Sequence, residues 1–365
     1  MLQLHTVLGG LLGLAAVASP ALAQTLPQTP GPKNAITDVP GIEVGQYTAS
    51  LATGGMTGTT VIIARGGATA GVTQRGGAPG TRETDLLKSE KAVGTAHAIV
   101  LSGGSAYGLA AADGVMTCLE NQGIGTPVAN GAIVPVVPSA ILFDPGRCAP
   151  FTFRPDASFG TNACSAANNG PVQMGNVGAG AGARSGGVKG GLGTASALLP
   201  NGVVVGAIVA VNSSGRTFDA ATGQFFAGYT LGTSETAVAT APATPDVNSD
   251  ELLRATTVAV VATNARLTKA QANKVAQMAD DGLARAIRIA HGTGDGDTVF
   301  ALATGTATAN PSINQIGGAA ADALSRAIIR AIQAATGIHV GTGTGSCNVN
   351  SYCELFPQNC AAARR

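Results

Sequence analysis

Apolar residues follow two different spacings in the C-terminal third of the chain. Residues 256–263 form an uninterrupted, largely β-branched apolar run, which is typical of a buried strand. Thr268, with Gln271 three residues later, then predicts a helix start. Apolar residues recur at three- and four-residue steps until His291-Gly292 ends the pattern. Residues 298–303 are again apolar, so this region predicts a strand, a long helix and a second strand.

The same two spacings organise the rest of the chain. A second long helix is predicted from Ser312 to Gly337 and a shorter one from Tyr107 to Glu120. Residues 203–211 form a hairpin with the strand that precedes the turn Pro200-Asn201-Gly202. Other strand-like segments are residues 42–47, 58–64, 98–101, 133–138 and 141–143. We expect a mixed sheet with helices packed outside it.

The N-terminal residues 1–23 have the pattern of a secretory signal peptide. An apolar core spans residues 7–17, and Ala21-Leu22-Ala23 is a small-x-small cleavage site. The apolar core is shorter than the roughly 20 residues that cross a bilayer, which disfavours a membrane anchor. We therefore predict a secreted or periplasmic protein.

Few side chains carry charge, and the charges balance. Charged residues make up 11% of the chain, the formal net charge is +1, and 52 residues are glycine. Because no basic patch stands out, neither a nucleic acid nor a membrane surface is expected as a partner. So little charge with 45% hydrophobic residues favours an oligomer, since interfaces cover apolar surface.

Six cysteines fit an oxidising compartment. Three of them lie in the short tail of residues 346–365, where their spacing does not fit zinc binding. We expect disulfides to fasten this tail, with one bridge inside it. Six cysteines allow 15 pairings, and the sequence does not select among them.

Three familiar kinds of site are disfavoured. The four histidines lack metal-ligand spacing, and Asp295-Gly296-Asp297 lacks the later carboxylates of a calcium loop, so no metal is predicted. Gly104-Ser105-Ala106-Tyr107 lacks the final glycine of a nucleophile elbow, although such a turn suits backbone N–H groups facing an anion. The glycine-rich stretches 178–182 and 341–345 lack the acidic residue of a dinucleotide fingerprint, so no cofactor is predicted.

The remaining chemistry centres on Thr256, which follows a Pro- and Asp-containing linker at residues 241–250. Cleavage before Thr256 would create an α-amine whose pKa of about 7.7–8.0 suits a base near neutral pH. Nucleophile and base then share one residue, and no histidine is needed. Asp295 and Asp297 point the same way from an extended segment and reach Thr256 if the two strands are neighbours. A solvated turn explains the Asp pair equally well.

Seven stretches in a fixed order resemble the DmpA-like aminopeptidase family, which includes L-aminopeptidase/D-esterases, β-aminopeptidases and nylon-oligomer hydrolases. They are NAITDVPG (34–41), RGGAPGT (75–81), LSGGSAYGL (101–109), GNVGAG (175–180), KGGLGTAS (189–196), TTV (256–258) and DGDTVFA (295–301). The resemblance implies an α+β fold, a four-layer αββα sandwich like that of N-terminal-nucleophile hydrolases. It also implies self-cleavage into residues 24–255 and 256–365, two chains of one domain.

The resemblance assigns roles to individual residues. Thr256 matches the nucleophile, and Asp295 and Asp297 match the acidic pair of the nylon-hydrolase branch. Asn212 matches the residue that binds the oxyanion. Lys189 matches a lysine that stabilises developing charge or lowers a neighbour's pKa. Ala255 stands where the nylon hydrolases have asparagine, which leaves the rate of cleavage open.

The implied activity is hydrolysis of small peptides, amino-acid amides or amide oligomers through an acyl-enzyme, by two-chain units within a homo-oligomer. Two alternatives stay open. One is an N-acyl transferase of the ornithine acetyltransferase type, although that biosynthesis is cytosolic. The other is a secreted binding protein on the same fold that does not cleave itself. Tyr107 and Phe143 are candidate substrate contacts, although such aromatic residues more often belong to the core.

Overall fold

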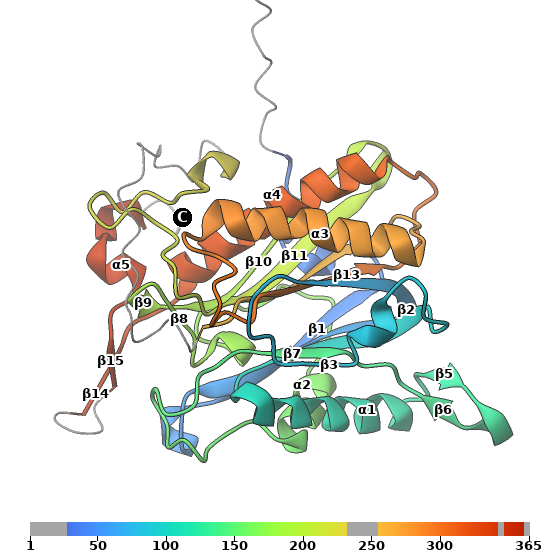
Figure 1. The fold of residues 1–365 in the computed structure, drawn as a ribbon, viewed down its shortest axis with the longest axis horizontal. Helices are drawn as coiled ribbons and strands as arrows, with labels where there is room; N and C mark the ends of the chain where they lie inside the picture. Colours follow the sequence, from blue (N-terminus) through green and yellow to red (C-terminus); the bar gives the residue numbers. More distant parts are fainter. Residues whose placement is uncertain (1–27, 232–254, 342–346, 361–365) are drawn as a thin grey trace, which may run out of the picture.

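A computed structural model describes residues 28–231, 255–341 and 347–360 of the chain (Figure 1). The predicted signal peptide, the linker at residues 241–250 and both ends of the tail segment lie outside the described residues. Among the residues that are described, no helix is both long and apolar enough to cross a membrane.

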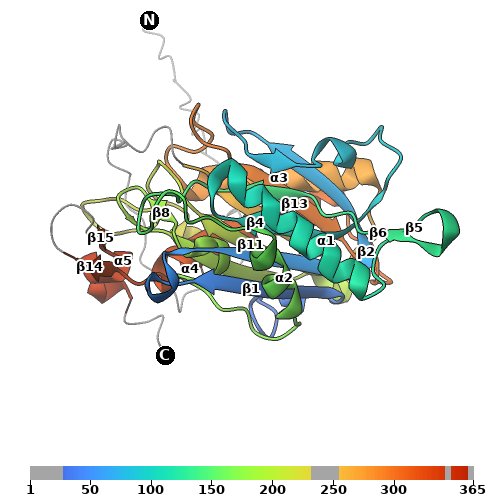
Figure 2. The same cartoon turned by 90° about the horizontal axis from the view of Figure 1, so that it is seen from below.

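Helices cover both outer faces of a layered β-structure (Figure 1). Helices α3 (Lys269–Ala286) and α4 (Ile313–Ala334) lie on one face. Helices α1 (Ala111–Asn121) and α2 (Ala157–Ser165) lie on the opposite face, where Figure 2 shows them in front of the strands. The layers between them are sheets, so the predicted αββα sandwich is confirmed.

The strands form one continuous hydrogen-bonded path that folds into two layers. Its order is β10 (Gly191–Leu198), β11 (Val204–Val211), β12 (Val258–Thr263), β13 (Thr298–Ala303), β2 (Thr57–Gln74), β4 (Thr95–Ser102), β7 (Ser139–Ile141) and β3 (Thr81–Arg82). The long strand β2 belongs to both layers. Its second part, from Thr69 to Gln74, pairs with β13, and its first part pairs with β1 (Ile42–Ala49). This strand joins the two sheets.

Three hydrophobic layers separate the four layers of backbone. Val261 on β12 packs with Leu283 and Leu324 beneath α3 and α4. Its neighbour Val260 points to the other face of the strand and packs between the two sheets, with Phe300. This alternation is the two-residue period of a strand that is covered on both faces, and it explains why residues 256–263 are apolar without interruption. Each fully buried valine or leucine contributes about 1.5–3 kcal/mol.

The third layer lies between the other sheet and helices α1 and α2, and it contains Val61, Val100 and Val115. Helix α2 was not predicted. It has only nine residues, and its apolar positions are too few to form a recognisable stripe. The helix predicted from Tyr107 begins instead as a 3₁₀ turn, Ser105–Ala110, which α1 continues.

Two predicted element boundaries are wrong: the start of strand β12 and the end of helix α3. Strand β12 begins at Val258, two residues later than predicted. Helix α3 ends at Ala286 and does not reach His291, because the chain turns extended at Ile287 and Arg288 then exchanges two backbone hydrogen bonds of 2.8 Å with Arg216. Such contacts between distant segments leave no trace in local periodicity.

Shorter elements complete the description. They are β5 (Thr126–Pro127), β6 (Ile133–Val134), β8 (Arg184–Ser185), β9 (Val188–Lys189), β14 (Ile338–Val340), β15 (Cys347–Val349) and α5 (Tyr352–Leu355). Most of the strand predicted at residues 133–138 is irregular, since only its first two residues pair, and β7 ends two residues before Phe143. The hairpin of β10 and β11 is confirmed.

Three disulfides connect the six cysteines. Cys118–Cys164 joins α1 to α2, and Cys353–Cys360 is the bridge expected inside the tail. Cys148–Cys347 joins the loop after β7 to strand β15. These bridges fit a protein that folds outside the cytoplasm.

Candidate active site

Strand pairing brings the predicted site residues to one edge of the sheet. Strands β12 and β13 are parallel, with Val258 opposite Thr298, so the segments that precede them start from the same edge. Strand β11 runs antiparallel to β12 and therefore ends there. Asn212, which follows β11, accepts a 2.5 Å hydrogen bond through its backbone carbonyl from the Thr256 N–H. The expectation that Thr256 and the Asp pair lie on neighbouring strands is confirmed.

The peptide bond before Thr256 has a polar environment of its own. The Thr256 hydroxyl donates to the Ala255 carbonyl at 2.5 Å. The Gly296 N–H lies 3.1 Å from the Thr256 Oγ1 and 3.2 Å from the Ala255 oxygen. Thr256 is 4% exposed, so these contacts are shielded from water. Hydroxyl, carbonyl and N–H donor therefore converge on one peptide bond.

Gly296 has to be glycine at this position. A Cβ atom added there would lie 2.7 Å from the Thr256 Oγ1 and 2.8 Å from the Ala78 carbonyl oxygen. Both distances are too short for real contacts. The glycine between the two aspartates thus allows the backbone N–H to approach the threonine hydroxyl. This donor was not predicted from the sequence, where the two flanking carboxylates are the visible signal.

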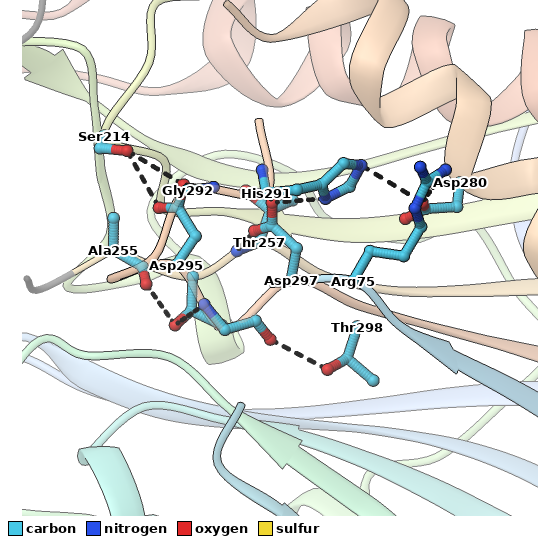
Figure 3. Close-up of polar contacts among 12 residues, drawn as sticks. Arg75, Ser214, Ala255, Thr257, Asp280, His291, Gly292, Asp295, Asp297 and Thr298 are labelled. Carbon is cyan, nitrogen blue, oxygen red and sulfur yellow. Dashed lines mark hydrogen bonds and ion pairs between the residues drawn. The ribbon is translucent and has the colours of Figure 1, made fainter. Parts of the chain in front are cut away.

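Asp297 fixes the backbone next to Thr256. Its Oδ1 accepts from the Thr257 N–H at 2.8 Å, and its Oδ2 accepts from the His291 N–H at 2.9 Å (Figure 3). The carboxylate is 2% exposed. Asp297 therefore orients the start of β12 through a backbone donor and does not bond the Thr256 hydroxyl in this uncut chain.

Asp295 is held from a different direction. Ser214 donates its hydroxyl to both carboxylate oxygens, at 3.0 and 3.2 Å, and the Gly292 N–H donates at 2.8 Å (Figure 3). Burial raises the pKa of Asp295, and the nearby charge of Asp297 raises it further. The two aspartates therefore have distinct partners, and Asp295 takes up a proton more readily than a free carboxyl does.

His291 is a site residue that the sequence analysis passed over. Its Nδ1 lies 3.1 Å from Asp297 and its Nε2 lies 3.2 Å from Asp280 on α3 (Figure 3). Burial lowers the pKa of His291, but the two carboxylates outweigh that effect and raise it to about 9. The signal available in the sequence was its place in the turn just before Asp295, because its partner Asp280 becomes close only through packing of α3.

Lys189 is completely buried near the other end of the site. Its ammonium group donates to the carbonyls of Gly180 and Gly190 at 2.9 and 2.8 Å. Burial lowers its pKa to about 7, and the charge of the buried Asp144 opposes only part of that shift. Strand β9 pairs Lys189 with Arg184, whose N–H donates to the Asn212 Oδ1 at 3.0 Å. The short hairpin of β8 and β9 therefore links Lys189 to Asn212 by way of Arg184.

Asn212 has its side-chain donor directed away from the Ala255 carbonyl. Its Nδ2 donates to the Phe143 carbonyl at 3.2 Å, while its Oδ1 accepts from Arg147 and from the Arg184 N–H. In the uncut chain, the donors at the Ala255 oxygen are the Thr256 hydroxyl and the Gly296 N–H. Asn212, the expected oxyanion residue, therefore contacts Thr256 through its backbone carbonyl. Its side-chain amide bonds to Phe143 and Arg147 in the loop after β7.

The candidate substrate contacts lie in that loop region. Phe143 is part of an aromatic pair with Phe151, whose ring centre is 6.5 Å away. Tyr107 is 57% exposed and lies under the Arg154 guanidinium, 3.6 Å from its ring centre. In the turn before Tyr107, where backbone N–H groups were expected to face an anion, the Gly104 N–H donates to the Asp144 carboxyl group at 2.7 Å. Burial raises the pKa of Asp144.

Among the described residues, no three metal-ligating side chains gather into a site. The sequence profile of peptidase family S58 matches residues 34–345. The chain belongs to peptidase family S58. This membership makes it a hydrolase of the peptidase class, and it confirms the resemblance drawn from the seven sequence stretches.

Several relatives extend this assignment across the chain. An uncharacterised aminopeptidase of Mycobacterium leprae (strain TN) is 44% identical and covers 89% of this chain and 95% of its own length. A 6-aminohexanoate-oligomer endohydrolase of Kocuria sp. (strain KY2) is 31% identical over 73% of this S58 chain and 74% of its own.

Two solved structures share the fold. A Burkholderia sp. β-aminopeptidase is 26% identical, with a TM-score of 0.67, and the match covers 92% of this chain and 95% of that one. An L-aminopeptidase D-Ala-esterase/amidase from Ochrobactrum anthropi, described as a variant of the Ntn hydrolase fold, has a TM-score of 0.66. That match covers 93% of this chain and 96% of the other at 21% identity, and it supports the fold alone.

Proposed function

We propose that this protein is an exported aminopeptidase or amidase that cleaves its own chain before Thr256 and then uses Thr256 as an N-terminal nucleophile. The observation that carries the proposal is the contact of the Thr256 hydroxyl with the Ala255 carbonyl, with the Gly296 N–H at both oxygens. A hydroxyl and a preorganised donor at one buried carbonyl are the two elements that an acyl shift needs.

Self-cleavage would proceed as an acyl shift from nitrogen to oxygen. The Thr256 Oγ1 attacks the Ala255 carbonyl carbon, and the oxygen of that carbonyl gains negative charge that the Gly296 N–H stabilises at 3.2 Å. The bond from carbon to the Thr256 nitrogen breaks, and the nitrogen takes the hydroxyl proton. Water then hydrolyses the ester, which leaves a carboxylate on Ala255 and a free amine on Thr256.

The mature enzyme would repeat this chemistry on a substrate. The α-amine of Thr256 accepts the hydroxyl proton as the hydroxyl attacks an amide carbonyl, and it returns the proton to the leaving amine. Once Ala255 has moved away, Gly296 offers its N–H to the new oxyanion, and Asn212 and Lys189 are the further groups proposed to stabilise it. Water releases the acyl group. Asp295 and Asp297 hold the terminus in place.

The proposed substrates are small peptides, amino-acid amides and amide oligomers. The relatives described above are named as an aminopeptidase, an oligomer endohydrolase and a β-aminopeptidase. Their names support hydrolysis over the alternative of acyl transfer to an amine. Residues near Tyr107 and Phe143 are proposed to line the substrate, because the Phe143 carbonyl contacts Asn212 directly.

The disulfides determine whether the two chains separate after cleavage. Cys148 belongs to residues 24–255 and Cys347 to residues 256–365, so the Cys148–Cys347 bridge would hold the two chains together after the cut. The other two bridges each lie within one chain. We propose that such linked pairs assemble further into a homo-oligomer, which light scattering tests.

The deciding experiment compares the full chain with the variant T256A, by gel and intact mass with and without reduction. Two chains that separate only after reduction, one beginning with Thr-Thr-Val-Ala-Val, would support the proposal, together with release of ammonia from amino-acid amides. T256A should stay whole and inactive. A wild-type chain that stays uncut for days at neutral pH would instead support the binding-protein alternative.

A further inference from the structure

His291 occupies a position that the proposed reaction does not use. Both ring nitrogens face carboxylates, Asp297 at 3.1 Å and Asp280 at 3.2 Å, and the side chain is only 15% exposed. Its backbone has a φ of +60°, the left-handed conformation that is uncommon for residues with a side chain. A strained backbone that presents both ring nitrogens to buried acids is typical of a functional constraint.

The neighbouring charges form a row that ends beside Thr256. Arg75, after strand β2, lies 3.4 Å from Asp280 on α3 and 3.9 Å from the exposed Asp281. Asp280 contacts His291, and His291 contacts Asp297. Asp297 accepts the Thr257 N–H at 2.8 Å, so the row is joined to the residue that follows Thr256.

Charge balance within this row depends on the histidine. Asp280 and Asp297 are each at most 2% exposed. Buried carboxylates need counter-charges, because an unpaired buried charge is costly. Arg75 lies beside Asp280, whereas the ring beside Asp297 is that of His291. The pKa of His291 rises to about 9 beside the two carboxylates, so its imidazole is charged at neutral pH. The charge of Asp297 also acts on the adjacent Asp295, whose pKa is raised by burial and further by that charge.

We propose that His291 is a positioning residue: its imidazole, held between Asp280 and Asp297, keeps the Asp297 carboxylate aimed at the Thr257 N–H, and through this contact it sets the position of the Thr256 nucleophile. The inference rests on the proposed function. His291 touches neither the hydroxyl nor the scissile bond, so it acts only through Asp297.

The test follows self-cleavage of the full chain after synthesis in an oxidising cell-free system, between pH 6 and 10. In H291Q, cleavage should slow roughly 10²-fold, the size expected when a reacting group is displaced by about 1 Å. The wild-type rate should fall as the pH rises through about 9, and H291Q should lack that fall. The matched control is H339Q, because His339 has an equal 3.2 Å contact with Glu354 at an exposed site.

The double variant D280N/H291Q separates positioning from simple stability. It removes one negative and one positive charge together, so the buried row keeps its net charge. Its stability should recover while its cleavage stays slow. Recovery of the cleavage rate together with the stability would overturn the positioning role. So would a wild-type rate in H291Q at every pH.

A second readout does not depend on activity. In protein carrying ¹⁵N-labelled histidine, the imidazole resonance assigned by its loss in H291Q should titrate with an apparent pKa of about 9, and D297N should lower that value. Titration near 6.5 would contradict the inference. If wild type and T256A both stay uncut, the proposed function has failed; the titration still tests the charge of His291.

Discussion

Two buried clusters of charged residues lie near Thr256, and they differ in how their charges are paired. On the carboxylate side, Asp280 and Asp297 have a cation between them in His291. On the lysine side, the Lys189 ammonium donates only to the backbone carbonyls of Gly180 and Gly190, within the part of the chain that the structure describes. Lys189, Asp280 and Asp297 are each at most 2% exposed, whereas His291 is 15% exposed.

The pKa values of His291 and Lys189 reflect this difference in pairing. The partners of His291 raise its pKa to about 9, whereas burial lowers that of Lys189 to about 7. His291 is therefore charged at neutral pH, while Lys189 changes protonation there. Burial lowers the pKa of both groups, and the two carboxylates beside His291 outweigh it, whereas the single Asp144 charge near Lys189 does not.

The largest expected effect comes from removing the donor between the two sides. In G296A, the new methyl group would displace the Thr256 hydroxyl and the N–H that faces Ala255. Loss of one oxyanion donor costs about 10²–10³-fold in rate, so both self-cleavage and amide hydrolysis should fall by at least that factor. Progress is followed by reducing gel. The control is G318A, where a Cβ on α4 meets nothing within 4 Å; normal cleavage in G296A would refute this role.

Next in size is the loss of the bridge that fastens the lysine side. Cys347 lies in the tail three residues before Asn350, whose carbonyl accepts the Lys189 N–H at 2.8 Å. The double variant C148S/C347S should lose about 2–4 kcal/mol of unfolding free energy. It should also give separate chains on a gel without reduction. The control C353S/C360S leaves the chains linked. Equal behaviour of the two variants would argue against a bridge across the cut.

The third prediction concerns stability against pH. Because the folded pKa of His291 is raised, its contribution is complete below pH 6.5 and disappears as the pH rises through about 9. Because the folded pKa of Lys189 is lowered, its contribution is complete above 10.5 and is lost as the pH falls through about 7. Between pH 7 and 9 the two slopes have opposite signs, each up to about 1.4 kcal/mol per pH unit.

Urea unfolding between pH 6.5 and 9 measures these slopes. K189M should make stability fall more steeply as the pH rises, and H291Q should make it fall less steeply or rise. A shift of both variants in the same direction would mean that the two sides do not differ in the way described.

The smallest effect is expected at the surface. His339 and Glu354 are 48% and 44% exposed and lie 3.2 Å apart, a distance like that of the buried histidine contacts. Exposed ion pairs contribute about 0–1 kcal/mol, so H339Q should change the unfolding free energy by less than 1 kcal/mol and should not alter cleavage. A large effect would show that exposure is not what separates this pair from His291.

Much of the architecture was predictable because its signals are local. The buried strand after Thr256 and the capping box at Thr268 were both located from neighbouring residues. Helix α2 was missed because its pattern is short, and the end of α3 was misplaced because a backbone pairing with Arg216 sets it. The candidate site was predicted in part: Thr256 and the two aspartates lie on neighbouring segments as expected, although the carboxylates bond Thr257, Ser214, Gly292 and His291 and not the Thr256 hydroxyl, whereas Gly296 and His291 were not recognised.

The sequence by itself determined the kinds of elements, their order and the family, because periodicity and motif order are properties of adjacent residues. Only the tertiary structure decided which cysteines pair, which N–H faces the Ala255 carbonyl and which acids surround His291. Asp280 and Asp297 are 17 residues apart and meet at one imidazole because α3 packs against β13 and β2. Protonation at this site depends on burial and on charges brought in by distant segments, and neither is encoded at the residue that titrates.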